Sequence, residues 1–299
     1  MRRILKSLML TCFIICTGIV IAQEPETFNT ENYILYKPSK TDAILILFGG
    51  FGEDGVGIEN EFPITDLAIS KNVAVFYLNY NRKIILQDEE KTQLAAMLQT
   101  LISSNDLPKD AIYIGGLSSG GAMALLISNY LTENVAYDIK PVGVFAVDSP
   151  IDLAAMYRIA KQNVERNFSP ADAGESTFIL QFFNTQLGDP DVEITPYEKH
   201  SSFVYETENF QNLKALKNTK IRLYTEPDKT WWKQNMGVEY EQMNAFHLER
   251  MSQFLMSQDY KHVEFISTKD KGYRADGTRH PHSWSIVDQE DLLKWILNL

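Results

Sequence analysis

The segment Gly115-Gly116-Leu117-Ser118-Ser119-Gly120-Gly121 decides how this chain folds. An apolar run at residues 111–117 is typical of a buried strand, and the almost wholly apolar residues 119–131 are typical of a helix. Ser118 therefore falls at a tight strand-to-helix turn. Glycines two residues to either side are needed there because larger side chains would collide. Such a turn exposes the Ser118 hydroxyl and aims the free N–H groups of the next helix at a developing negative charge.

Short apolar runs alternate with helical patterns on both sides of this turn. Further buried strands are predicted at 43–48, 73–80, 142–147, 221–224 and 263–267, because these runs are apolar on both faces and bounded by Gly, Pro or Asp. Apolar stripes at helical spacing occupy 87–103, 239–257 and the segment from 286 to the C-terminus. The alternation predicts an α/β fold with a doubly wound, mostly parallel sheet.

Residues 150–220 interrupt the alternation. They show no clear strand and mix helix-like pieces with turns such as Gly188-Asp189-Pro190. A tract of that length with its own hydrophobic residues is too long for a bare loop. We therefore expect a helical cap insertion over one edge of the carboxyl ends of the strands, within a single domain at 41–299 that follows a polar lead-in at 23–40.

The first 22 residues have the pattern of a secretory signal peptide. Arg2, Arg3 and Lys6 precede an uncharged apolar run at 7–21, and cleavage is expected after Ala22. The protein is then exported, to the periplasm or the extracellular space. The alternative is an uncleaved membrane anchor, although the run is near the lower limit for crossing a bilayer.

Composition and charge exclude several classes of protein. With 44% hydrophobic and 22% charged residues, the chain is neither disordered, collagen-like nor a multi-pass membrane protein. Both cysteines lie in the leader, so the mature chain has no thiol nucleophile. It keeps 25 basic and 39 acidic residues, a formal charge of −14. Nucleic acid is therefore an unfavourable partner, and anionic substrates are disfavoured.

The segment around Ser118, with its strand and helix, resembles the nucleophile elbow of the α/β-hydrolase superfamily, nearest to the esterase and dienelactone-hydrolase branches. The resemblance extends from about Lys40 to the C-terminus. It implies a triad in the order serine, acid, histidine, with Ser118 as the nucleophile.

The resemblance also guides the choice of acid and histidine. The acid usually ends the second strand after the elbow strand, where Asp228 matches best; Glu226 is the first rival and Asp148, after the intervening strand, is the second. His282 matches the histidine on the loop before the last helix, with His280 as the alternative. The two histidines also form an H-x-H pair, but no carboxylate or cysteine cluster at metal spacing joins them. No metal or organic cofactor is implied.

Two backbone N–H groups are expected to bind the oxyanion. One belongs to Ser119, after the nucleophile, and the other to Phe51, in the loop Phe48-Gly49-Gly50-Phe51-Gly52. In the superfamily a histidine is common where this chain has Gly49, so the hydrogen bonds of that side chain are absent here and the shape of the loop is open.

The same resemblance predicts an exported serine hydrolase that cleaves a small-molecule or glycan-linked carboxylic ester. A serine peptidase or amidase on the same fold is one alternative, and a non-catalytic scaffold that binds glycan or protein is another. Gly50-x-Gly52-x-x-Gly55 after a strand also spells a dinucleotide fingerprint, but Glu53 and Asp54 would repel a pyrophosphate. The insertion is expected to hold the contacts that select the substrate.

Overall fold

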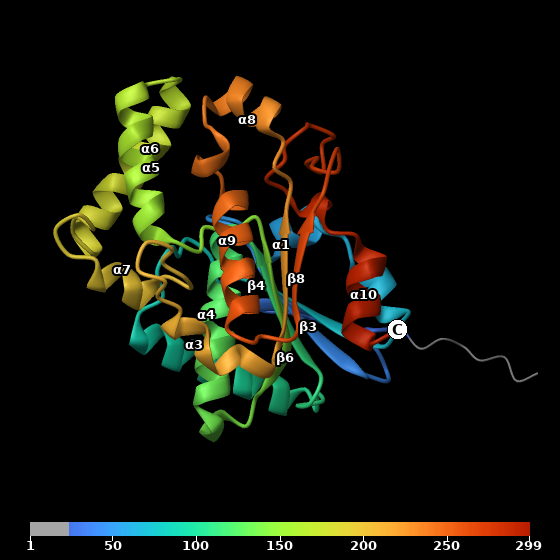
Figure 1. The fold of residues 1–299 in the computed structure, drawn as a ribbon. Coiled ribbons are helices and arrows are strands. Elements are labelled where there is room, and N and C mark those ends of the chain that lie inside the picture. The colour runs from blue at the N-terminus through green and yellow to red at the C-terminus, as the bar shows by residue number, and fades with distance from the viewer. Residues whose placement is uncertain (1–23) are drawn as a thin grey trace, which may run out of the picture.

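The computed structural model describes residues 24–299 (Figure 1). Eight strands form one sheet in the order β1-β2-β4-β3-β5-β6-β7-β8. From β4 to β8 all neighbours are parallel, whereas β1 and β2 run antiparallel at one edge. The strands are β1 (Glu26–Asn29), β2 (Tyr33–Lys37), β3 (Ala43–Phe48), β4 (Val73–Leu78), β5 (Ile112–Leu117), β6 (Pro141–Val147), β7 (Lys220–Thr225) and β8 (Val263–Ser267).

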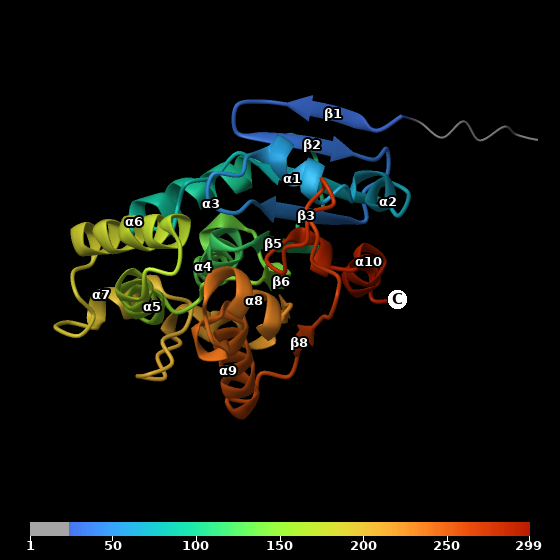
Figure 2. The same ribbon diagram turned by 90° about the horizontal axis from the view of Figure 1, so that it is seen from above.

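Helices cover both faces of this sheet. One core lies between the sheet and α3, α4 and α9, and a second lies between the sheet and α1, α2 and α10 (Figure 2). Their bounds are α1 (Gly55–Glu61), α2 (Thr65–Ile69), α3 (Asp88–Ser104), α4 (Ser119–Glu133), α9 (Asn244–Ser257) and α10 (Gln289–Leu297). The strands β3 to β5 are buried along their whole length, which explains their unbroken apolar sequences. The predicted α/β class with a mostly parallel sheet is thus confirmed. None of the helices in residues 24–299 is both long and apolar enough to cross a membrane.

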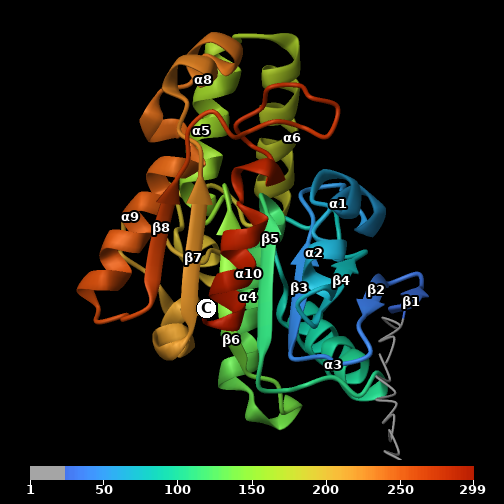
Figure 3. The same ribbon diagram turned by 90° about the vertical axis from the view of Figure 1, so that its right-hand side faces the viewer.

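The segment between β6 and β7 is helical and stands beyond the carboxyl ends of the strands (Figures 1 and 3). Its helices pack around a separate apolar cluster that includes Leu153, Tyr157, Phe183 and Tyr197. A short helix after β7 stands beside them. The bounds are α5 (Leu153–Arg166), α6 (Pro170–Gln186), α7 (Thr195–His200) and α8 (Lys229–Met236).

The lead-in at 23–40 differs from the expectation of a segment outside the domain. It forms β1 and β2, and β2 pairs with β4 so that Leu35 is fully buried in the core. The sequence gives little sign of β1 because all four of its residues are exposed. The signal-peptide prediction for residues 1–22 lies outside the described residues.

Candidate active site

Ser118 occupies a strained turn between β5 and α4. Its φ of 55° and ψ of −128° lie in a region that non-glycine residues rarely adopt. The flanking glycines are required by contact: a Cβ on Gly116 would lie 2.4 Å from the carbonyl carbon of Gly120, and a Cβ on Gly120 would lie 2.3 Å from the carbonyl oxygen of Gly49. The turn therefore has the geometry predicted from the sequence, and it presents Ser118 to a cavity at the carboxyl edge of the sheet.

The loop after β3 lies against this turn. A Cβ on Gly50 would be 3.6 Å from the Cβ of Ser118. Within residues 24–299 neither the N–H of Phe51 nor that of Ser119 has a hydrogen-bond acceptor. The two predicted oxyanion donors thus belong to adjacent segments and are free to bind an oxygen.

The Phe51 side chain contacts the cap. It is 47% exposed and packs against Phe178 of α6, with ring centroids 5.7 Å apart. The cap helix therefore touches the segment that carries one of the two predicted oxyanion donors.

The imidazole of His282 contacts the carboxylate of Asp148. The Nδ1 atom of His282 lies 2.6 Å from Oδ2 of Asp148. Thr225 donates to the other carboxylate oxygen at 2.8 Å. Asp148 directly follows β6, and its side chain is only 6% exposed. A buried carboxylate in this position fixes both the tautomer and the orientation of the imidazole.

The structure corrects the sequence-based choice of Asp228. Asp228 caps α8 by accepting from the N–H of Trp231 at 2.9 Å, and its other oxygen lies 2.8 Å from Arg279. It does not contact His282. Asp148, the second rival on sequence grounds, contacts His282 instead.

Glu226, the first rival, is also engaged elsewhere. Its buried carboxylate lies 2.6 Å from the Arg279 guanidinium and accepts hydrogen bonds from Thr268 and from the N–H groups of Lys271 and Gly272. These contacts fix the loop that leads from β8 to His282. Glu226 and Asp228 both pair with Arg279, which offsets their negative charge, and neither carboxylate contacts the imidazole of His282.

His280 lies beside His282 but in a different environment. It packs against Trp231 at 4.9 Å between ring centroids, and its Nδ1 accepts from the N–H of His282. Burial, followed by the positive charge of Arg274, lowers the pKa of His280 to about 4. His280 is therefore neutral at physiological pH and already holds a hydrogen bond at Nδ1.

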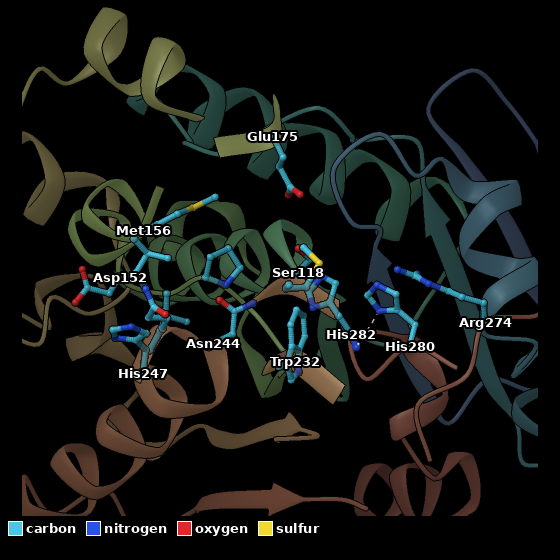
Figure 4. Close-up of a pocket in the computed structure, with 15 residues that line it drawn as sticks. Ser118, Asp152, Met156, Glu175, Trp232, Asn244, His247, Arg274, His280 and His282 are labelled. Atoms are coloured by element: carbon cyan, nitrogen blue, oxygen red, sulfur yellow. Dashed lines mark hydrogen bonds between the residues drawn. The ribbon is translucent and has the colours of Figure 1, made fainter. Parts of the chain in front are cut away.

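Ser118, His280 and His282 line one cavity of about 350 Å³ (Figure 4). Figure 4 shows the His282 imidazole beside Ser118 in the middle of the cavity. The walls come from the cap, from the segment after β7 and from the loop before His282, and they include Met156, Ile159, Glu175, Trp232, Met236, Asn244 and Arg274.

Two tryptophans and a histidine near the cavity differ in their surroundings. Trp232 lines the cavity, whereas Trp284 is fully buried and stacks on Phe62 with centroids 5.0 Å apart. His247 is buried on α9 and borders the same cavity. Burial lowers its pKa.

Several solved structures share this architecture. Carboxyl esterase 2 from Tuber melanosporum matches with a TM-score of 0.54 and 14% identity over 93% of this chain and 87% of that chain. An alpha-beta hydrolase from Vibrio vulnificus matches with 0.52 and 15% over 92% and 80%. The acylaminoacyl peptidase of Pyrococcus horikoshii matches with 0.51 and 13% over 92% of this chain but 41% of its own.

No protein-family model and no curated protein matches the sequence. The structural matches show that the chain has the fold of the α/β-hydrolase superfamily.

Proposed function

We propose that this protein is a serine hydrolase that cleaves carboxylic esters, with Ser118 as nucleophile, His282 as base and Asp148 as the supporting acid. The observation that carries the proposal is the contact of Asp148 with Nδ1 of His282, a residue that lines the same cavity as Ser118. A serine hydroxyl needs a base to lose its proton, and the base needs a fixed tautomer to accept it. These three residues meet both needs.

The reaction has two halves. Ser118 Oγ attacks the ester carbonyl carbon while its proton moves to Nε2 of His282, and the N–H groups of Phe51 and Ser119 bind the resulting oxyanion. When the tetrahedral species collapses, His282 returns the proton to the departing alcohol, which leaves an acyl group on Ser118. Water then attacks the acyl carbon with His282 as base, and Ser118 recovers its proton as the acid departs.

The cavity supports a small-molecule ester or the acylated end of a glycan as substrate. Its volume of about 350 Å³ is near the lower end of the range for small-ligand sites, and both apolar and polar side chains line it. The leader sequence at residues 1–22 supports export as part of the same proposal.

Labelling with a fluorophosphonate tests the nucleophile. We expect the wild-type protein to label at one site and to hydrolyse activated esters, and Ser118→Ala to lose both. Ser70→Ala removes a serine hydroxyl that is exposed on the surface and serves as the matched control. Full labelling of Ser118→Ala would refute the assignment. A panel of acyl chain lengths, acetylated sugars and dipeptide amides then separates an esterase from an amidase.

A further inference from the structure

We infer that Glu53 is a positioning residue for the proposed hydrolysis, because its carboxylate ties the oxyanion loop to the loop that carries His282. This inference rests on the proposed function. Glu53 follows β3 in the loop that contains Gly50 and Phe51. No residue of the proposed triad contacts the Glu53 carboxylate within residues 24–299, so its role would be exerted through the backbone.

One oxygen of Glu53 makes both connections. Oε2 accepts the N–H of Gly50 at 2.8 Å and the indole N–H of Trp284 at 3.2 Å. Gly50 immediately precedes Phe51, whose N–H is the proposed oxyanion donor. Trp284 lies two residues after His282. A single carboxylate oxygen therefore fixes the oxyanion loop relative to the segment that supplies the base.

The Trp284 end of this connection is rigid. The indole is fully buried and stacks on Phe62 with centroids 5.0 Å apart and an interplanar angle of 21°. An anchor of this kind holds the Glu53 oxygen in place, and through it the Gly50 amide. The N–H of Glu53 also donates to the carbonyl oxygen of Gly50 at 3.0 Å, so Glu53 holds Gly50 through both its backbone and its side chain.

The space around Glu53 agrees with this role. A Cβ on Gly49 would lie 2.7 Å from the backbone oxygen of Glu53 and 3.0 Å from its Oε2. The Glu53 side chain thus occupies the room that a side chain at residue 49 would need. Burial raises the pKa of Glu53, while the hydrogen bonds from Gly50 and Trp284 act in the opposite direction. Those two donors are what make a partly buried carboxylate tolerable here.

The test compares two substitutions at Glu53. Glu53→Gln keeps an acceptor oxygen and is expected to keep kcat within about threefold, whereas Glu53→Ala removes it. For Glu53→Ala we expect kcat on an activated ester to fall about 10²-fold, with KM changed less than about threefold, because a displaced oxyanion donor weakens binding of the transition state more than of the substrate. The rate of fluorophosphonate labelling should fall in parallel.

Asp54→Ala is the matched control. Asp54 is the next carboxylate in the chain and caps α1 by accepting the N–H of Gly57 at 2.9 Å, but it does not contact Gly50 or Trp284. We expect it to lower the urea midpoint of unfolding and leave kcat unchanged. This result separates loss of stability from loss of positioning.

Two results would overturn the inference. One is a folded Glu53→Ala protein with wild-type kcat, and the other is equal impairment of Glu53→Gln and Glu53→Ala. If Glu53→Ala does not fold, Trp284→Phe removes the other donor of the bridge, and an unchanged kcat there would also overturn it. Full labelling of Ser118→Ala would instead refute the proposed function, so the two failures are distinguishable.

Discussion

Replacing Asp148 by asparagine should remove most of the activity, and replacing Asp228 should not. In the proposed reaction His282 accepts a proton and becomes positively charged, and the Asp148 carboxylate lies 2.6 Å from its Nδ1 atom. With an effective dielectric constant of about 20, opposite charges about 4 Å apart attract by about 4 kcal/mol. Each 1.36 kcal/mol corresponds to a factor of about ten in rate, so the loss of this attraction alone lowers kcat about 10³-fold.

The tautomer adds to this loss. Thr225 already donates to the other oxygen of Asp148, so an asparagine there would turn its carbonyl toward Thr225 and its NH2 group toward His282. The imidazole would then carry its proton on Nε2 and could not accept one from Ser118. The total expected decrease in kcat for Asp148→Asn is about 10³- to 10⁴-fold.

The assay is steady-state hydrolysis of an activated ester, with circular dichroism to verify folding. Asp228→Asn is the matched control, since this side chain caps α8 and pairs with Arg279. Its kcat is expected to stay within about threefold of wild type, because neither of these contacts touches the triad. If Asp228→Asn lost as much as Asp148→Asn, or if a folded Asp148→Asn kept a tenth of the activity, the assignment of the acid would be refuted.

Three further predictions concern stability. Arg279→Met leaves the buried Glu226 carboxylate without its cation, so the free energy of unfolding should fall by about 3 kcal/mol in urea titrations, and an unchanged midpoint would contradict this. Gly120→Ala forces a methyl group into the backbone of the oxyanion loop, so the free energy of unfolding should fall by about 1–3 kcal/mol. Gly174→Ala, in open space on α6, should raise the free energy of unfolding by up to about 1 kcal/mol. The pKa of His280 is about 4 in the folded protein and about 6.5 in the unfolded chain, so between pH 6.5 and 4 the unfolded state binds one more proton. The free energy of unfolding should therefore fall as the pH decreases over this range, and His280→Gln should make that fall smaller.

The sequence was sufficient for the central strands and for the turn at Ser118. Strands buried on both faces need continuous apolar runs, and the turn needs small residues where backbones meet, so both leave local patterns. The edge strand β1 leaves none, because it is exposed at every residue and is held only by pairing with β2. Its place in the sheet depends on a partner rather than on its own residue pattern.

The sequence led to His282 because it follows the last strand and precedes the last helix, and its role as the base stays a prediction. The acid could not be placed in the same way. Asp148, Glu226 and Asp228 all stand just after strands that meet at one edge of the sheet, so chain position alone allows each of them near the imidazole. In the structure only Asp148 contacts His282, whereas Glu226 and Asp228 pair with Arg279, and these partners cannot be deduced from spacing.

A carboxylate that is paired with a guanidinium attracts a third, positively charged group only weakly. The opposite charges of the pair nearly cancel each other's electrostatic effect on that group. Arg279 holds Glu226 and Asp228 in this way. Asp148 has no Lys or Arg side chain within 4.0 Å among residues 24–299, and the Thr225 hydroxyl donates to it. The carboxylates after β7 therefore fix the course of the loop that carries His282, while the carboxylate after β6 fixes the ring itself.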